Sequence, residues 1–147
     1  MITISHLTKI FEGKGPRVTA LEDVNLEIGK GDIYGIIGMS GAGKSTLLRC
    51  LTLLERPTSG QIMLAGQDIA SLSGAQLRAA RRGMGVVFQG YNLLMQKTVA
   101  ENVAFPLRLE KGYDRAAVQA RVAELLAIVG LEDRAGAYPA QLSGGQK

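Results

Sequence analysis

The sequence predicts an α/β domain with a helical insertion. Two strand patterns open the 147-residue chain, and a glycine-rich loop follows between an apolar run and a helical stretch. The second half of the chain has mostly helical patterns. Because a chain of this length fits one domain, we expect a small sheet, then a β–loop–α unit, then helices.

Two strands are expected at the N-terminus. Residues 2–11 begin with alternating apolar and polar residues. Residues 19–28 place Val24, Leu26 and Ile28 on one face of a strand. Turns that contain glycine follow both segments, so the pair is predicted to be of antiparallel type.

A β–loop–α unit is expected next. Residues 32–37 form a short apolar run typical of a buried strand, and residues 44–54 form a proline-free apolar stretch suited to a helix. The loop between them matches G-x-x-x-x-G-K-[ST], the P-loop or Walker A pattern. Its residues are Gly38, Met39, Ser40, Gly41, Ala42, Gly43, Lys44 and Ser45. A chance match is the alternative, and the strand–loop–helix context argues against it.

The residue types in this loop suit a phosphate. Glycines let the backbone bend so that successive N–H groups point inward at an anion. The N-terminus of the following helix adds partial positive charge. Lys44 supplies a point charge for the β- and γ-phosphates, and the Ser45 hydroxyl is a hard oxygen ligand for Mg²⁺. The stretch therefore predicts nucleotide binding.

A strand, a helix and a second strand are expected after the loop unit. Residues 61–65 have a strand pattern, and a turn follows them. Ser73 can cap a helix that runs to about Arg82 and is ended by Gly83. Residues 84–88 then predict a short buried strand with Gln89 at its C-terminal end.

Two further helices are expected in the second half. Thr98 and Glu101 form a capping-box pattern for a short helix that Pro106 is expected to end. Asp114 can cap the longest helix. The apolar stripe of that helix comprises Val118, Val122, Leu125 and Val129, with Gly130 at the position of a C-terminal cap.

The composition limits the partners and the compartment. The net charge is +4, but the tight basic cluster 78–82 lacks interleaved aromatic residues, which favours a solvated helix face over a nucleic-acid surface. Cys50, the single cysteine, is expected to be a small buried residue rather than a reactive thiol. The sequence has no apolar run of transmembrane length and no signal-peptide pattern, so the cytoplasm is expected.

A second anion cradle occupies residues 142–146, Leu-Ser-Gly-Gly-Gln. Two glycines beside a serine supply free N–H groups and a hydroxyl, an arrangement that works best at a helix N-terminus. A glycine-rich surface turn is the alternative. Together with the P-loop and Gln89, this string resembles the signature of the ATP-binding subunit of ABC transporters. The resemblance covers essentially the whole chain.

The resemblance implies a site shared between two copies. In this family two domains pair head to tail around two ATP molecules with Mg²⁺. Gln89 looks like the Q-loop glutamine that reaches Mg²⁺ and the attacking water, which makes it the catalytic candidate, and Ser45 and Gln89 are the implied metal ligands. Phe11 occupies the place of the aromatic residue that stacks on adenine, with a core residue at a strand end as the alternative. The residues implied to contact ATP are Gly38, Met39, Ser40, Gly41, Ala42, Gly43, Lys44, Ser45 and Thr46 and, from the second copy, Ser143, Gly144, Gly145 and Gln146.

The same resemblance implies an ABC ATPase core with an N-terminal antiparallel β subdomain and a helical subdomain. The P-loop is expected at 38–45, the Q-loop at about 89–96, the helical subdomain at about 98–141 and the signature at 142–146.

The implied partners are a transmembrane permease subunit, a second copy of the ATPase and an extracytoplasmic solute-binding protein. The ATPase would lie on the cytoplasmic face of the cell membrane. Four segments together look most like the methionine importer, which implies uptake of methionine or another amino acid: residues 53–60, 80–85, 88–94 and 102–107. Residues 91–94 resemble the surface that grips the coupling helix of the membrane subunit. The alternatives are the ATPase of a lipoprotein-release or other exporter, a soluble ABC ATPase of DNA repair or translation, and a non-catalytic nucleotide-binding fragment.

The sequence departs from the family after the signature. The Walker B aspartate and glutamate and the switch histidine are absent, and His6, the single histidine, lies in the first strand. The core is therefore expected to be truncated before the Walker B strand. We expect nucleotide binding without useful hydrolysis, a poorly ordered signature, and exposed apolar surface with an unpaired sheet edge.

Overall fold

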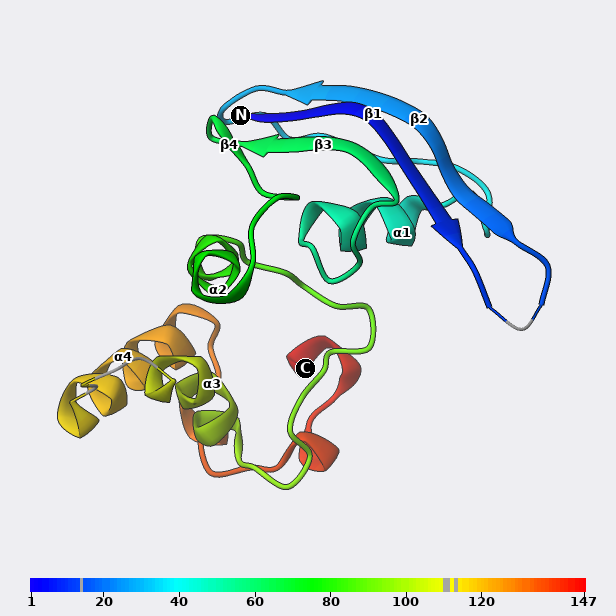
Figure 1. Cartoon of the computed structure of the whole chain (residues 1–147). Coiled ribbons are helices and arrows are strands. Elements are labelled where there is room, and N and C mark those ends of the chain that lie inside the picture. The colour runs from blue at the N-terminus through cyan, green and yellow to red at the C-terminus, as the bar shows by residue number, and fades with distance from the viewer. Residues whose placement is uncertain (14, 110–111, 113) are drawn as a thin grey trace. The chain divides into compact units, whose positions relative to one another are not determined.

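The computed structural model describes residues 1–13, 15–109, 112 and 114–147. The chain divides into two compact units, Met1–Gly85 and Val86–Lys147. The first unit holds the β-sheet and two helices, and the second unit is helical (Figure 1). In the part of the chain that is described, none of the helices has the length and apolar character needed to cross a membrane.

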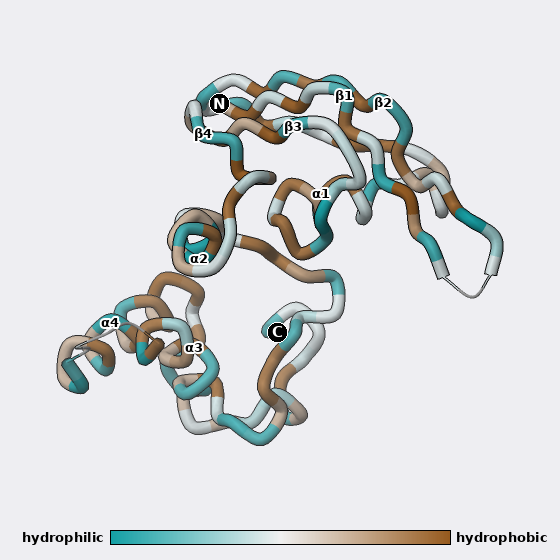
Figure 2. The backbone as a smooth tube through the Cα atoms, in the orientation of Figure 1, coloured by the Kyte–Doolittle hydropathy of each residue, from teal (hydrophilic) through white to brown (hydrophobic). Residues whose placement is uncertain are grey.

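An antiparallel four-stranded sheet with the order β2-β1-β3-β4 forms the frame of the first unit. Its strands are β1 (Ile2–Phe11), β2 (Val18–Ile28), β3 (Ser59–Leu64) and β4 (Gln67–Asp68). The predicted N-terminal pair is confirmed, with Ile4 opposite Leu26 and Phe11 opposite Val18. The alternation of hydrophilic and hydrophobic residues along β1 can be followed in Figure 2.

A bulge interrupts the pairing of β1 with β2. His6 and Asp23 both adopt left-handed backbone angles, with φ of 52° and 47°, and the register shifts between Ile4 and Leu7. The His6 N–H donates to Asn25 Oδ1 at 2.8 Å, and His6 Nδ1 lies 2.7 Å from Asp23 Oδ1. Side-chain bonds therefore replace the ladder bonds that the bulge removes.

Helix α1 (Lys44–Leu51) packs its apolar face against the sheet. The buried core comprises Ile4, Leu7, Leu21, Leu47, Cys50, Leu53, Ile62, Ile69 and Leu72. Cys50 is fully buried, which confirms its predicted role, and burial raises the pKa of its thiol. The helix ends three residues earlier than expected because the chain turns at Leu53, where φ is 52°.

Helix α2 (Gly74–Arg82) has the predicted bounds, with Ser73 before it and Gly83 after it. The predicted solvated face is wrong for Arg81, whose guanidinium donates to the carbonyl oxygens of Thr52 and Leu53. Carbonyl groups at a helix C-terminus lack intrahelical partners, so the arginine satisfies the end of α1 and ties α2 to it.

Two predicted buried strands are wrong. Residues 32–37 and 84–88 are described throughout, and neither segment pairs as a strand. The side chains of Ile33, Ile37 and Val87 are 103%, 94% and 101% exposed. An apolar run sets a preference for burial, but a strand forms only where a neighbouring strand accepts its hydrogen bonds. The expected exposed apolar surface is therefore present, and the segment after α2 is coloured hydrophobic in Figure 2.

The second unit is built on α3 (Val99–Arg108) and α4 (Arg115–Ile128). Three short 3₁₀ helices follow, η1 (Glu132–Arg134), η2 (Pro139–Gln141) and η3 (Gly144–Gln146). The buried core of this unit comprises Val99, Ala104, Val118, Val122, Leu126 and Leu142. The signature segment is thus anchored to the two helices through Leu142.

The predicted capping box of α3 is confirmed. Thr98 Oγ1 accepts a hydrogen bond from the Glu101 N–H, and Glu101 Oε2 accepts one from the Thr98 N–H. That second bond holds the pKa of the Glu101 carboxyl below its usual range. Pro106 does not end the helix, which continues to Arg108, because a proline near the C-terminus removes only one backbone bond.

The ends of α4 are as predicted, but part of its apolar stripe is not. The Asp114 carboxylate accepts from the N–H groups of Ala116 and Ala117, and Gly130 has a left-handed φ of 67° after the helix. The third buried residue is Leu126 rather than Leu125, and Val129 is 63% exposed.

Candidate functional site

The predicted P-loop leads directly into α1. Gly41 and Gly43 have φ of 82° and 85°, angles at which a residue with a Cβ atom is strained. A Cβ atom at Gly43 would lie 2.5 Å from the Ala20 carbonyl oxygen and 3.1 Å from Leu21 Cδ2, whereas a Cβ atom at Gly41 would meet nothing within 4 Å. Gly43 therefore lets the loop rest against β2, and Gly41 lets the loop turn in open space.

The Lys44 side chain folds back over the loop. Its Nζ donates hydrogen bonds of 2.8 Å to the Gly38 carbonyl oxygen and 2.7 Å to that of Met39. Lys44 is also the first residue of α1, while the next residue, Ser45, is exposed. Lys44 and Ser45 therefore place an ammonium group and a hydroxyl group at the N-terminus of α1, where the helix dipole is positive.

This set of groups fits a phosphate with Mg²⁺. The ammonium and the helix N-terminus favour an anion, and a serine hydroxyl is a hard oxygen ligand. Thr46, the remaining residue of the predicted set, is on the first turn of α1.

Phe11 lies at the end of β1, outside the buried core. Its side chain is 40% exposed, and Lys9 Nζ lies 4.7 Å from the ring centroid. Phe11 pairs with Val18, two residues along β2 from the Ala20 carbonyl that borders Gly43. The aromatic ring and the P-loop are therefore attached to the same end of β2.

Gln89 belongs to the second unit, where it is exposed and directly precedes the loop that leads to α3. Tyr91 and Asn92 are consecutive left-handed residues, with φ of 61° and 52°. The loop exposes apolar side chains, with Tyr91 50%, Leu94 40% and Met95 56% exposed. An exposed apolar patch of this kind is typical of a partner surface.

The signature residues form a turn that two hydrogen bonds close. The Ser143 N–H donates to Gln146 Oε1 at 3.0 Å, and the Gln146 N–H donates to the Ser143 carbonyl oxygen at 3.2 Å. The Tyr91 hydroxyl lies 3.7 Å from the position of a Cβ atom at Gly144. The second unit therefore brings the loop after Gln89 beside the signature.

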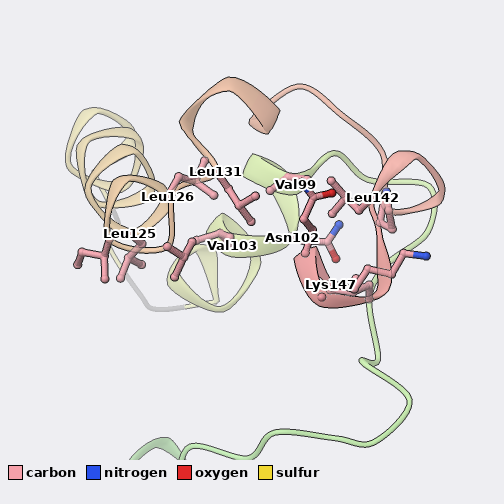
Figure 3. Close-up of a pocket in the computed structure, with 14 residues that line it drawn as sticks. Val99, Asn102, Val103, Leu125, Leu126, Leu131, Leu142 and Lys147 are labelled. Atoms are coloured by element: carbon pink, nitrogen blue, oxygen red, sulfur yellow. The ribbon is translucent and has the colours of Figure 1, made fainter.

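A cavity of about 490 Å³ lies between α3, α4 and the signature (Figure 3). Its labelled lining is mostly aliphatic, with Val99, Val103, Leu125, Leu126, Leu131 and Leu142 beside Asn102 and Lys147. Within the ranges that the structure describes, no three His, Cys, Asp or Glu side chains gather as metal ligands. The cavity offers apolar surface rather than a catalytic cluster.

The predicted site residues thus divide between the two units. The first unit brings the P-loop and Phe11 to one end of β2, and the second unit brings the Q-loop segment to the signature. Asn102, which bonds to the backbone of the loop after Gln89, was missed from the sequence. The sequence signal for this role is the position of Asn102, which lies four residues after the predicted helix cap Thr98.

Comparisons with known proteins agree on one family. The sequence profile described as ABC transporter matches residues 21–147. Over all 147 residues the chain is 56% identical to a methionine import ATP-binding protein of Symbiobacterium thermophilum and covers 44% of that protein. It is 54% identical to the protein of the same name from Desulfitobacterium hafniense and covers 43% of it. The chain therefore spans less than half the length of these curated relatives.

Solved structures give the same result. A dimeric post-hydrolysis state of the ATP-binding cassette MJ0796, bound to ADP and Pi, matches with a TM-score of 0.89 and 35% sequence identity. The match covers 99% of this chain and 65% of that one. A second dimeric structure of MJ0796, described as a bacterial ABC transporter cassette, matches equally well.

Proposed function

The chain belongs to the ABC transporter family, and on that premise we propose that it forms the nucleotide-binding part of an importer ATPase. The observation that carries the proposal is the loop before α1, where Gly43 rests on β2 and the Lys44 ammonium lies over the loop carbonyls. The proposed ligand is ATP with Mg²⁺.

Each residue of the loop has a proposed task. Loop N–H groups and the N-terminus of α1 bind the phosphates, and Lys44 supplies the compact positive charge between them. Ser45 supplies an oxygen ligand for Mg²⁺, which neutralises charge on the β- and γ-phosphates when it is bound. Phe11 offers an exposed aromatic face to the adenine ring, supported by its place at the same end of β2.

Two copies of the whole protein are proposed to share their sites. The similar cassette structures are dimers, which supports pairing. Ser143, Gly144, Gly145 and Gln146 would supply donors to the nucleotide held by the other copy. Gln89 would orient the attacking water and hold Mg²⁺. The exposed loop after Gln89 would transmit the conformational change of the ATPase to a transmembrane permease.

The transported solute is proposed to be methionine or another small amino acid. The support is the name of the relatives, which are methionine import proteins. Import also implies an extracytoplasmic protein that delivers the solute, and the proposed position of this subunit is the cytoplasmic face of the membrane. Hydrolysis of ATP, uptake and these partners are proposed for the whole protein.

Titration of the purified chain with Mg-ATP in a calorimeter tests the proposal. We expect saturable binding that is lost in Lys44→Ala and retained in Lys30→Ala, because Lys30 lies in an exposed turn outside the loop. Equal binding in both variants, or no binding in a chain whose circular dichroism shows that it is folded, would refute the assignment. Uptake of labelled methionine by cells that carry Lys44→Ala in the whole protein tests the solute.

A further inference from the structure

The side chain of Asn102 joins the start of α3 to the loop that follows Gln89. The Leu94 N–H donates to Asn102 Oδ1 at 2.8 Å, and Asn102 Nδ2 donates to the Leu94 carbonyl oxygen at 3.1 Å. The same Nδ2 donates to the carbonyl oxygens of Lys97 at 3.1 Å and Thr98 at 2.9 Å. One amide group therefore binds both backbone groups of Leu94, as a neighbouring strand would.

These bonds hold a loop that has few backbone bonds of its own. Between Leu94 and α3 the described backbone supplies the bond from the Lys97 N–H to the Leu94 carbonyl oxygen, at 3.0 Å. Upstream, Tyr91 and Asn92 adopt left-handed angles that a residue with a Cβ atom rarely takes. Such angles persist only where surrounding contacts fix the chain.

We propose that Asn102 is a positioning residue that fixes the loop 94–98 to α3, so that the loop and the helix move as one body. The inference rests on the proposed function, in which this loop contacts the membrane partner. The bonds hold the backbone of Leu94, whose side chain is 40% exposed, and the next side chain, Met95, is 56% exposed. A displacement of the loop by the partner then moves α3 and the core behind it.

The chemistry of the four bonds makes the position specific for asparagine. The two N–H groups of Nδ2 are shared among three carbonyl oxygens and Oδ1 accepts the fourth bond, and only an amide of this length supplies both kinds of group. Asn102→Asp would keep the acceptor for the Leu94 N–H but would set a carboxylate against three carbonyl oxygens. Asn102→Ala would lose all four bonds while raising the helix propensity of α3.

Amide hydrogen exchange tests the bonds themselves. In Asn102→Ala we expect exchange at the Leu94 amide to quicken by about tenfold or more, while the Ala104 amide inside α3 keeps its protection. Asn102→Asp should also raise the Leu94 rate, because its carboxylate is repelled by the carbonyl oxygens of Leu94, Lys97 and Thr98. Glu101→Gln, which preserves the capping box, is the matched control and should leave Leu94 unchanged. A Leu94 rate in Asn102→Ala equal to that of the control overturns the proposal.

The role in coupling is tested in the whole protein assembled with its membrane partner. We expect Asn102→Ala to keep the KM for Mg-ATP and to lose about fivefold or more of the partner-stimulated kcat, whereas Glu101→Gln stimulates normally. Normal stimulation in Asn102→Ala refutes the coupling role. If the wild-type complex shows no stimulated hydrolysis, the proposed function and the coupling role both fail, and the Leu94 exchange rate still decides whether Asn102 fixes the loop.

Discussion

The Gly43→Ala substitution tests how the P-loop is fixed to the sheet, and Gly41→Ala is its matched control. Both glycines lie in the same loop at nearly the same φ, 85° and 82°. They differ in their surroundings, because a Cβ atom at Gly43 would lie 2.5 Å from the Ala20 carbonyl oxygen and a Cβ atom at Gly41 would meet nothing within 4 Å. The pair therefore separates backbone strain from packing.

The expected magnitudes follow from this difference. A left-handed backbone costs an alanine about 1–2 kcal/mol, and the reduced freedom of the unfolded chain offsets about 0.4–1 kcal/mol of that cost. Gly41→Ala should therefore lower the free energy of unfolding by about 1 kcal/mol. Gly43→Ala carries the same cost plus about 1–3 kcal/mol of overpacking against a backbone atom of β2.

Urea unfolding without nucleotide, followed by circular dichroism, measures the free energy of unfolding of each variant. With a slope of about 1–3 kcal/mol per molar urea, the midpoint of Gly43→Ala should lie about 1 M below that of Gly41→Ala. A difference between the variants of less than about 0.5 kcal/mol would show that β2 yields to the new methyl group and that Gly43 is needed only for its φ. Nucleotide affinity, measured separately, should fall in both variants.

Three further predictions concern groups outside the loop. Cys50 should react with a thiol reagent about a hundredfold more slowly in the folded chain than in urea, because its thiol is buried with a raised pKa; reaction at the rate of an exposed cysteine would contradict this. The hydrogen bond from Lys9 lowers the pKa of the Glu55 carboxyl, so its stabilisation is present above the unfolded pKa and is lost as the pH falls through the folded pKa. Thermal unfolding of Glu55→Gln between about pH 3 and 7 should therefore show a flatter acid limb, and an unchanged limb would count against the bond. Thr98→Ala should lower the free energy of unfolding by about 1 kcal/mol while Thr98→Ser retains most of it, and equal losses in urea titrations would show that the hydroxyl cap does not matter.

Local patterns in the sequence were enough for the parts of the fold that depend on neighbouring residues. The alternation in residues 2–11 and 19–28 predicted the strand pair, because side-chain direction repeats every two residues. The capping box at Thr98 and the glycine pattern of the P-loop were recognised for the same reason, since each motif is complete within a few residues.

The errors fall where the outcome depends on residues far away in the chain. Residues 32–37 and 84–88 have the composition of strands, but their pairing depends on partners that the pattern does not name. Leu125 and Leu126 are equally apolar, and only the packing of α4 on α3 decides that Leu126 is buried. Arg81 and Asn102 were not assigned from sequence because their bonds run to backbone groups, which every residue carries, and the position of Asn102 after the Thr98 cap does not name the loop that it binds.

The two edges of the sheet determine how copies of this chain can associate. The outer strand β2 carries the bulge at Asp23 together with Glu22 and Glu27, and the opposite edge is the two-residue strand β4. Bulges, charges and very short strands all prevent another strand from adding to an edge. Growth of the sheet from one molecule into the next is thereby blocked. Association of two copies of this chain is therefore left to surfaces other than the edges of the sheet.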